Sequence, residues 1–186
     1  MTDAPRPSQL RSRLTLLLIV SMFFASFLVA AGLRFAGWTP ESARNYGELL
    51  QPPVHLGQVP LHRADGSLFA WQPESDRWSL VVAPAPGCTT ACTRTLDQLH
   101  RIWLSLGRKA DRLDVLWVGP LPEGQRFRRL VPMQPSAELS RALPGTAASA
   151  EGVVVYLVDP KGYVALRYPA GFDPAGLRKD LGKLIR

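Results

Sequence analysis

The sequence predicts an α/β domain preceded by one transmembrane helix. Two observations support this prediction: a long apolar run near the N-terminus, and short apolar runs that alternate with helical patterns over the rest of the chain. The chain has 186 residues, of which 46% are hydrophobic. This length and composition suffice for one domain with its own core in addition to an anchor.

The apolar run Leu14–Leu33 contains twenty residues and no charge. Because a helix rises 1.5 Å per residue, such a run reaches about 30 Å, the thickness of a bilayer core. A cleaved signal peptide is the alternative, with small residues at Val29-Ala30-Ala31 for cleavage. The run is longer than the usual apolar part of a signal peptide, so we favour an uncleaved transmembrane helix over residues 14–33.

Basic residues precede this helix. They are Arg6, Arg11 and Arg13, opposed by Asp3 alone. Because an excess of Lys and Arg stays on the cytoplasmic side, residues 1–13 are expected to be cytoplasmic and the C-terminal domain to lie across the membrane. A cleaved signal peptide would also place the domain outside the cytoplasm, where disulfides form and persist.

The charge of the domain itself is modest. The whole chain carries +7, but from Trp38 onward it has 18 basic and 14 acidic residues, which leaves +4. No run of Lys and Arg is interleaved with aromatic residues, so no nucleic-acid partner is expected.

Residues 34–53 are predicted to be a proline-containing tether, and residues 54–186 the domain. Within the tether, Asn45–Leu50 is expected to pack Tyr46, Leu49 and Leu50 onto the domain rather than to form a specific motif. After the tether, Val54–Leu61 and Ser67–Trp71 are predicted to pair as a hairpin. The Ala64-Asp65-Gly66 stretch supplies its turn, because Gly tolerates a positive φ and Asp can bind its own backbone.

The next elements form a β–α–β unit around the only two cysteines. Trp78–Ala83 is a short apolar run that ends at prolines, which is typical of a strand buried on both faces. The helix Thr93–Arg108 follows, and Leu113–Val118 is a second buried strand. Such a unit implies a parallel pair of strands with a right-handed crossover.

One face of the predicted helix is apolar at spacings of four and three: Cys92, Leu96, Leu99, Trp103 and Leu106. Cys92 is in phase with this face and is therefore expected to be buried. Cys88 lies before the helix and is expected to be the exposed thiol. Gly107 is expected to end the helix.

The C-terminal third predicts a hairpin and a helix. Pro120–Pro135 is expected to be an irregular surface segment, and Ser136–Leu143 a short helix capped by Ser136. The remaining elements are listed in chain order: strand Val153–Val158, turn Asp159–Gly162, antiparallel strand Tyr163–Tyr168, and a last helix opened by Asp173 and Pro174. A β–α–β unit followed by β–β–α, with cysteines before the first helix, is the thioredoxin arrangement.

The chemistry of Cys88 and Cys92 has three alternatives. A structural disulfide would close a ring of only five residues and would contribute roughly 2 kcal/mol, against about 4.7 kcal/mol for a 100-residue loop. Thiol–disulfide exchange is favoured by the N-terminus of the helix, whose unpaired N–H groups and partial positive charge stabilise a thiolate. Cu(I) binding is the third alternative, because Cu(I) prefers soft thiolate ligands.

No further ligand for such an ion stands out. His100 lies eight residues past Cys92, about 12 Å along a helix, which is too far to share one ion. The other candidates are His55 and His62 in the hairpin, Met133, and the hard oxygen ligand Glu151. Zinc would require about four ligands. Two charged groups are expected to be solvated: Asp111 with Asp114, and Arg126 with Arg128 and Arg129.

These features resemble the Sco/SenC family of membrane-anchored, thioredoxin-fold copper proteins. The similar residues are Asp65-Gly66, the strand into Cys88-x-x-x-Cys92 (CxxxC), and Tyr156-Leu157-Val158-Asp159-Pro160-Lys161-Gly162. Asn45–Leu50 is also similar to a stretch in small Sco-like proteins. Thr89 stands where the family has a proline, and Glu151 where it has its third copper ligand, a histidine.

The resemblance implies a role in assembling the copper site of cytochrome c oxidase. It places a single-pass protein in a bacterial inner membrane, with the domain in the periplasm. Cys88 and Cys92 would then be catalytic residues of a thiol–disulfide oxidoreductase, Cu(I) ligands, or both. The implied partner is an oxidase subunit or another periplasmic assembly factor. A non-catalytic assembly factor with a structural cysteine pair is the alternative.

Overall fold

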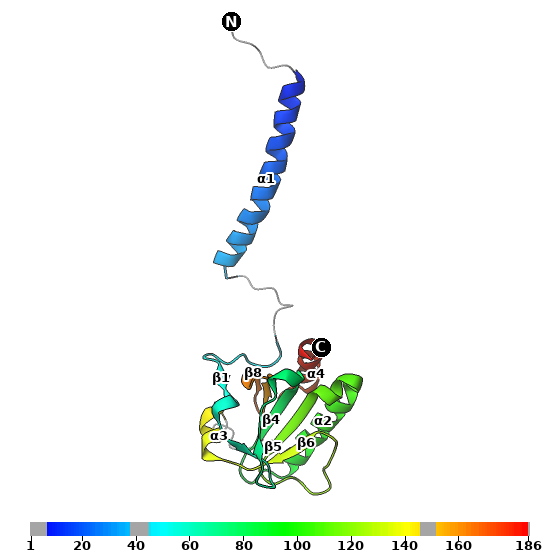
Figure 1. Cartoon of the computed structure of the whole chain (residues 1–186). Coiled ribbons are helices and arrows are strands. Elements are labelled where there is room, and N and C mark those ends of the chain that lie inside the picture. The colour runs from blue at the N-terminus through cyan, green and yellow to red at the C-terminus, as the bar shows by residue number, and fades with distance from the viewer. Residues whose placement is uncertain (1–6, 38–44, 146–151, 186) are drawn as a thin grey trace. The chain divides into compact units, whose positions relative to one another are not determined.

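The computed structural model describes residues 7–37, 45–145 and 152–185, in two units, Met1–Arg44 and Asn45–Arg186 (Figure 1). In the first unit, helix α1 (Pro7–Phe35) contains the stretch Ser12–Phe35, which is long and apolar enough to cross a membrane. This agrees with the transmembrane helix predicted from the sequence.

The second unit is built on a six-stranded sheet with the strand order β1-β8-β7-β4-β5-β6. The strands are β1 (Val54–His55), β4 (Trp78–Pro84), β5 (Leu113–Val118), β6 (Leu130–Met133), β7 (Val153–Val158) and β8 (Tyr163–Tyr168). β4, β5 and β6 are parallel, whereas β7 runs antiparallel to β4, and β8 and β1 continue that antiparallel half. The predicted β–α–β unit and the C-terminal hairpin are therefore confirmed.

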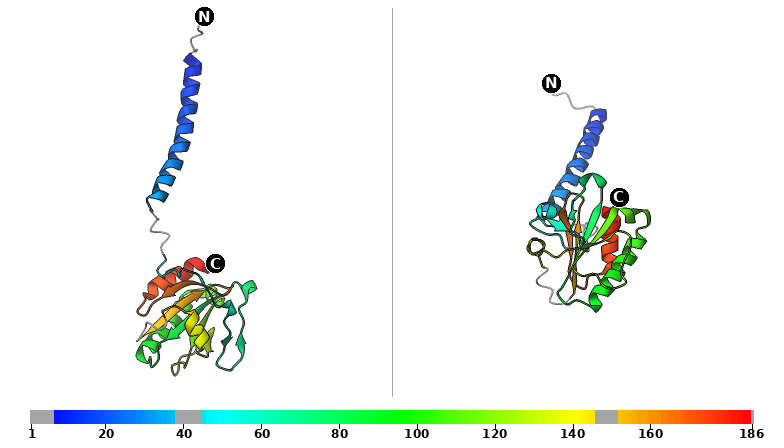
Figure 2. Two further views of the ribbon diagram at one scale, coloured as in Figure 1. Left: turned by 90° about the vertical axis from the view of Figure 1, so that its left-hand side faces the viewer. Right: turned by 60° about the horizontal axis from the view of Figure 1, so that its bottom comes forward.

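The two faces of the sheet are covered differently (Figure 2). Helices α2 (Thr90–Ser105) and α4 (Pro174–Leu184) pack on one face. The other face is covered by α3 (Ala137–Ala142) and by the 3₁₀ turn η2 (Leu56–Gln58), with a small hairpin beside them. The hairpin consists of β2 (Leu61–His62) and β3 (Leu68–Phe69).

The amphipathic pattern of α2 determines how it packs. Leu96 and Leu99 are almost fully buried against the sheet, together with Cys92 and Trp103. The helix ends at Ser105, and Gly107 follows with φ +57°, a left-handed conformation that suits glycine. The predicted apolar stripe is confirmed, although the helix begins at Thr90, three residues earlier than predicted.

The N-terminal hairpin is smaller than predicted. Only Leu61–His62 and Leu68–Phe69 pair with each other, whereas Val54–His55 pairs with β8 in the main sheet. The turn η2 lies between β1 and the hairpin. Within it, the N–H of Leu56 donates to the carbonyl of Gly162 at 2.7 Å.

The turn of this hairpin is as predicted. The carboxylate of Asp65 accepts hydrogen bonds from the backbone and the hydroxyl of Ser67, and these bonds lower the pKa of Asp65 from its ordinary value.

The segment predicted to be irregular contains the edge strand β6. Its prolines argued against a strand, but the edge of a sheet tolerates a proline whose missing N–H faces away from the ladder. The carbonyls of Arg129 and Met133 accept from β5 and the loop after it, so the odd positions of β6 face β5. Pro132 faces the other way, and its carbonyl accepts from Ala64 at 2.9 Å.

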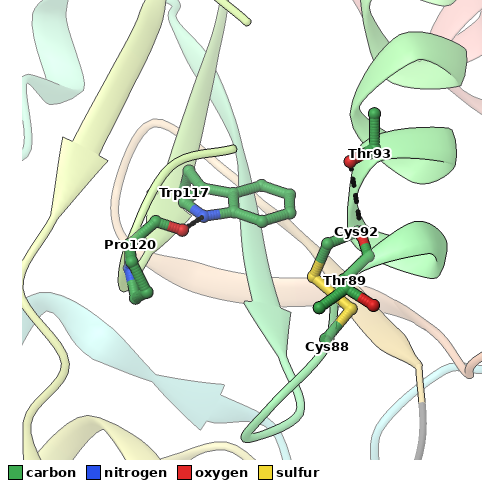
Figure 3. The surroundings of a disulfide bond; sticks show 6 residues. All are labelled: Cys88, Thr89, Cys92, Thr93, Trp117 and Pro120. Atoms are coloured by element: carbon green, nitrogen blue, oxygen red, sulfur yellow. Dashed lines mark hydrogen bonds between the residues drawn. A yellow bond between two sulfur atoms is a disulfide. The ribbon is translucent and has the colours of Figure 1, made fainter. Parts of the chain in front are cut away.

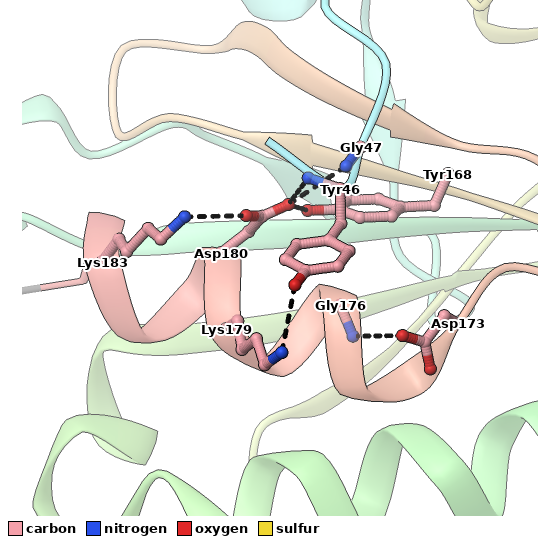
Figure 4. Close-up of polar contacts among 8 residues, drawn as sticks. All are labelled: Tyr46, Gly47, Tyr168, Asp173, Gly176, Lys179, Asp180 and Lys183. Atoms are coloured by element: carbon pink, nitrogen blue, oxygen red, sulfur yellow. Dashed lines mark hydrogen bonds and ion pairs between the residues drawn. The ribbon is translucent and has the colours of Figure 1, made fainter. Parts of the chain in front are cut away.

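The compact unit begins at Asn45, so residues 45–53 belong to the domain and not to the tether. The carboxylate of Asp180 is completely buried, and its Oδ2 accepts from the backbone N–H of Tyr46 at 2.8 Å and of Gly47 at 3.0 Å (Figure 4). The hydroxyl of Tyr168 donates to the same oxygen at 2.9 Å. We call these four residues the Asp180 cluster.

The expected packing of Asn45–Leu50 is only partly correct. Leu50 packs against the buried residues on the face of the sheet that α3 and η2 cover, which we call the second core cluster, whereas Leu49 is exposed. Tyr46 is half exposed, although its ring lies so close to Gly176 that a Cβ there would meet it at 2.7 Å. Backbone N–H groups attach this segment to α4, because a buried carboxylate binds them more strongly than an apolar contact would.

Candidate functional site

The cysteines lie where the buried strand β4 turns into α2. Ala85 donates its N–H to the carbonyl of Gly152 at 2.9 Å, which fixes the end of the strand beside the start of β7. The chain then turns through Gly87, whose φ of +75° is left-handed, and the N–H of Cys88 returns to the carbonyl of Ala85 at 3.2 Å. This turn places Cys88 directly before the first turn of α2.

Cys88 and Cys92 form a disulfide, with their Cα atoms 5.7 Å apart (Figure 3). The two sulfur atoms have different surroundings. Cys92 is 4% exposed and belongs to the core between the sheet and helices α2 and α4, whereas Cys88 is only partly buried. The burial of Cys92 agrees with its place on the apolar stripe.

The N-terminus of α2 can stabilise a negative charge on the sulfur of Cys88. Thr89 is the N-cap residue, but its side chain makes no capping hydrogen bond. Its carbonyl accepts the first intrahelical hydrogen bond, from the N–H of Thr93 at 3.1 Å. The first N–H groups of the helix therefore remain available to a negative charge at the Cys88 sulfur.

Two hollows meet at Cys88. The larger, of about 580 Å³, runs between the first turn of α2 and residues 120–123, and Cys92 also lines it. The smaller, of about 340 Å³, lies along residues 85–91 and reaches Gly152. The disulfide is thus accessible from one side, which is what an exchange partner requires.

The wall formed by residues 120–123 is held in place by the domain. Trp117 donates its indole N–H to the carbonyl of Pro120 at 3.0 Å (Figure 3). Further along, Gln125 donates to Asp97 on α2 at 2.8 Å. Phe127 stacks on His100 with ring centroids 4.5 Å apart. The sequence did not predict this wall. Residues 120–135 were expected to be an irregular surface segment, and no contact with α2 was predicted for them.

The candidate metal ligands other than cysteine are dispersed. His55 stacks on Tyr163, His62 lies in β2, and Met133 is buried in the second core cluster. Over residues 7–37, 45–145 and 152–185, no group of three His, Cys, Asp or Glu residues could hold a metal ion. Glu151 lies outside the described residues.

Asp114 was predicted to be solvated, and this prediction is wrong; Arg129, also predicted to be solvated, is only partly exposed. Asp114 is 7% exposed, and its carboxylate lies between the guanidinium groups of Arg77 and Arg129. Burial raises the pKa of Asp114 although both arginines oppose that shift. A charge inside a strand predicted to be buried could have revealed this site, because such a charge is stable only when it is paired. Arg128 is exposed and pairs with Asp111, as expected of surface charges.

The fold and the cysteine site define a thioredoxin-like protein: a sheet with a central β–α–β unit, a β–β–α end and a disulfide at the start of α2. The family model of transmembrane-like, thioredoxin-like, C-terminal domains matches residues 78–186, more than half of the chain. The chain belongs to that family. No curated protein matches it.

Solved structures share this fold. Apo Sco1 from Thermus thermophilus is 20% identical, with 78% of this chain and 99% of that chain covered and a TM-score of 0.54. Copper-bound Sco1 from yeast is 16% identical, with 73% and 92% covered and a TM-score of 0.51. A peroxiredoxin-like protein from Aquifex aeolicus is 14% identical, with 75% and 91% covered and a TM-score of 0.52. The resemblance to the Sco/SenC fold is therefore confirmed at the level of the fold.

Proposed function

We propose that this protein is a membrane-anchored thiol–disulfide exchange protein whose domain acts in the periplasm of a bacterial cell. The observation that carries the proposal is the asymmetry of its disulfide. Cys88 is partly exposed and lines both hollows at the N-terminus of α2, whereas Cys92 is 4% exposed and lines only the larger one. This asymmetry supports Cys88 as the attacking thiol and Cys92 as the resolving thiol.

The exchange step balances within the two proteins. In the reduced domain, the Cys88 thiolate attacks one sulfur of a partner disulfide and releases the other partner sulfur as a thiolate. The Cys92 thiolate then attacks the Cys88 sulfur, which forms the intramolecular disulfide and frees the second partner thiol. Two electrons pass from the domain to the partner. The reverse sequence oxidises a dithiol partner.

The partner that we propose is a cysteine-containing copper site of cytochrome c oxidase, reduced before it receives its metal. Support comes from the Sco-like fold and from the N-terminal helix, which would hold the domain near a membrane enzyme. Another periplasmic assembly factor would meet the same chemical requirement.

Cu(I) delivery is the second candidate, and the fold shared with copper-bound yeast Sco1 favours it. The reduced pair Cys88 and Cys92 would supply two soft thiolate ligands. A third ligand would have to come from Glu151, from solvent or from the partner.

The deciding experiment uses the full chain in neutral detergent. After reduction, we expect Cys88 to react with a thiol reagent faster than Cys92, and Cys92→Ser to accumulate a mixed disulfide with a model disulfide peptide. Thr90→Ser, which removes one exposed methyl group beside the site and keeps the hydroxyl, is the matched control. Failure of Cys92→Ser to trap any mixed disulfide would refute the exchange function.

A parallel titration addresses copper. Competition of the reduced chain against a chromophoric Cu(I) chelator, repeated with Cys88→Ser and Cys92→Ser, reports whether both thiols bind the ion. One equivalent bound tightly only when both are present would favour delivery of copper over exchange alone.

A further inference from the structure

A hollow of about 300 Å³ lies at the opposite end of the parallel strands from the disulfide. It opens where β4, β5 and β6 begin, beneath the segment that follows β3. Six of its lining residues are charged or aromatic: Arg63, Phe69, Trp71, Arg77, Asp114 and Arg129. The cysteine chemistry proposed above uses none of them.

The lining is positively charged. Three arginines face one carboxylate, that of Asp114, which leaves a formal charge of +2. The contacts between them are loose: Arg77 lies 3.7 Å and Arg129 3.6 Å from the nearer oxygen of Asp114. These distances exceed the 2.7–3.2 Å of an N–H···O hydrogen bond. Asp114 therefore offsets part of the charge without occupying the donors.

Buried N–H groups at this hollow have no acceptor. In the described part of the chain, four buried side-chain atoms lack a hydrogen-bond partner, and two of them are Trp71 Nε1 and Arg129 Nε. Most buried polar atoms in proteins are paired, because an unpaired one costs about 1–3 kcal/mol. Trp71 and Arg129 both line this hollow, where the oxygens of a bound ligand would pair these donors.

The backbone of Arg129 is held in an unusual conformation. Its φ is +74°, in the left-handed region that residues with a side chain rarely adopt. The carbonyl of Arg129 accepts from the N–H of Val115 at 2.9 Å, and this bond keeps the residue beside Asp114. Strain of this kind is typical of positions that hold a ligand group.

Arg63 is fixed on the other side of the hollow. Its guanidinium donates to the hydroxyl of Ser67 at 3.2 Å and to the carbonyl of Leu68 at 3.1 Å, and it lies over the ring of Phe69. Arginine forks suit carboxylate and phosphate oxygens, which they bind through two parallel hydrogen bonds.

We propose that this hollow binds a small dianion whose oxygens are carboxylate or phosphate oxygens. The +2 lining matches the charge of such a ligand, the unpaired donors match its acceptors, and the volume lies at the small end of ligand pockets. Arg77 and Arg129 would bind the oxygens, with Trp71 donating from the apolar wall.

Calorimetric titration of the full chain in neutral detergent tests the site, with inorganic phosphate and succinate as separate probes at constant ionic strength in chloride. We expect one equivalent of at least one probe to bind, and the preferred probe identifies the class of oxyanion. Arg129→Gln should weaken binding by about tenfold or more, because it removes a charged donor pair. Arg126→Gln removes an exposed arginine of the same loop and should change the affinity by less than about twofold.

Asp114→Asn separates a ligand site from a structural ion-pair cluster. It raises the lining charge to +3 and should tighten binding of the same probe by about threefold or more. Circular dichroism verifies that each variant is folded, and Arg77→Gln replaces Arg129→Gln if the latter is not. The proposal is overturned if neither probe binds the wild type or Asp114→Asn, if Asp114→Asn weakens binding or leaves it unchanged, or if Arg126→Gln weakens it as much as the pocket variants do.

Discussion

The disulfide and the Asp180 cluster both connect parts of the domain, but over very different lengths of chain. Cys88 and Cys92 are four positions apart. Asp180 binds Tyr46 and Gly47 across 134 and 133 positions. The covalent connection is therefore the local one, and the long-range connection consists of hydrogen bonds to one buried carboxylate.

The Asp180 cluster therefore contributes mainly to stability, whereas the disulfide is suited to chemistry. A ring of five residues removes little entropy from the unfolded chain, and the corresponding stabilisation is roughly 2 kcal/mol. Three hydrogen bonds to a buried carboxylate contribute more, since each such bond to a charged group is worth about 1.5–3 kcal/mol. The disulfide can therefore open and close without loss of the fold, as exchange requires.

Removal of the buried carboxylate should have the largest effect. Asp180→Ala leaves the N–H groups of Tyr46 and Gly47 and the hydroxyl of Tyr168 without an acceptor. We expect a loss of at least about 3 kcal/mol in the free energy of unfolding, because each unpaired group costs about 1–3 kcal/mol. Urea denaturation measures it, and Asp111→Ala, at an exposed ion pair, is the control. Equal stability of the two variants would contradict the claim that the Asp180 cluster stabilises the fold.

Removal of one bond of the cluster should have an intermediate effect. Tyr168→Phe should lower the free energy of unfolding by about 1.5–3 kcal/mol, the worth of a hydrogen bond to a charged group. Burial, followed by the contact with Asp180, raises the pKa of Tyr168. The folded state therefore holds this proton more tightly than the unfolded state does, and the resulting stability is lost as pH rises above about 10.

Denaturation curves between neutral and alkaline pH check this sign. The wild type should lose stability above about pH 10 more steeply than Tyr168→Phe does, because the variant has no phenol to titrate at this position. Parallel curves for the two proteins would show that Tyr168 does not carry the effect.

Opening the disulfide should change stability less than these substitutions, and loss of the Cys88 thiol should abolish exchange. Reduction of the wild type, or Cys88→Ser, is expected to lower the free energy of unfolding by no more than about 2 kcal/mol. Thiol exchange should disappear in Cys88→Ser. Denaturation with and without reductant measures the first effect. A loss as large as that of Asp180→Ala would show that the cysteine pair is structural.

The smallest effect is expected at Asp114. Burial raises its pKa, so its ionised form is disfavoured in the folded state, and stability falls as pH rises through the folded pKa. Asp114→Asn should therefore be slightly more stable than the wild type at neutral pH, by less than about 1 kcal/mol because the arginines are partly solvated. Its stability should also depend less on pH in the acidic range. A destabilised variant at neutral pH would show that the arginines outweigh burial.

The sequence predicted the parts of the fold that depend on local periodicity. The stripe through Leu96 and Leu99 placed Cys92 inside, because helical spacing alone determines which face a residue occupies. Cys88 was expected to be exposed because it precedes the helix, and it is partly buried. The capped helices at Ser136 and Asp173 followed from side chains that bind their own backbone, and both caps are present. The apolar runs predicted the central strands, because a strand buried on both faces has a continuous apolar sequence.

The missed features depend on partners far away in the chain. Asp180 binds backbone groups near residue 46, and no local pattern marks a backbone donor as the partner of a distant carboxylate. Asp114 lies in a strand predicted to be buried, but its partners are arginines at positions 77 and 129, which its own neighbours do not indicate. Strand β6 was missed because the orientation of Pro132 matters only once the neighbouring strand is known.

The pairing of the segment after the anchor with β8 also limits how the protein can self-associate. Glu48 exchanges backbone hydrogen bonds of 2.8 Å with Arg167, and Val54–His55 pairs further along the same strand. At the opposite edge, Arg63 bridges to Met133. Short strands and prolines at an edge prevent another chain from adding a strand. Both edges of the sheet are therefore protected against the addition of a strand from another copy.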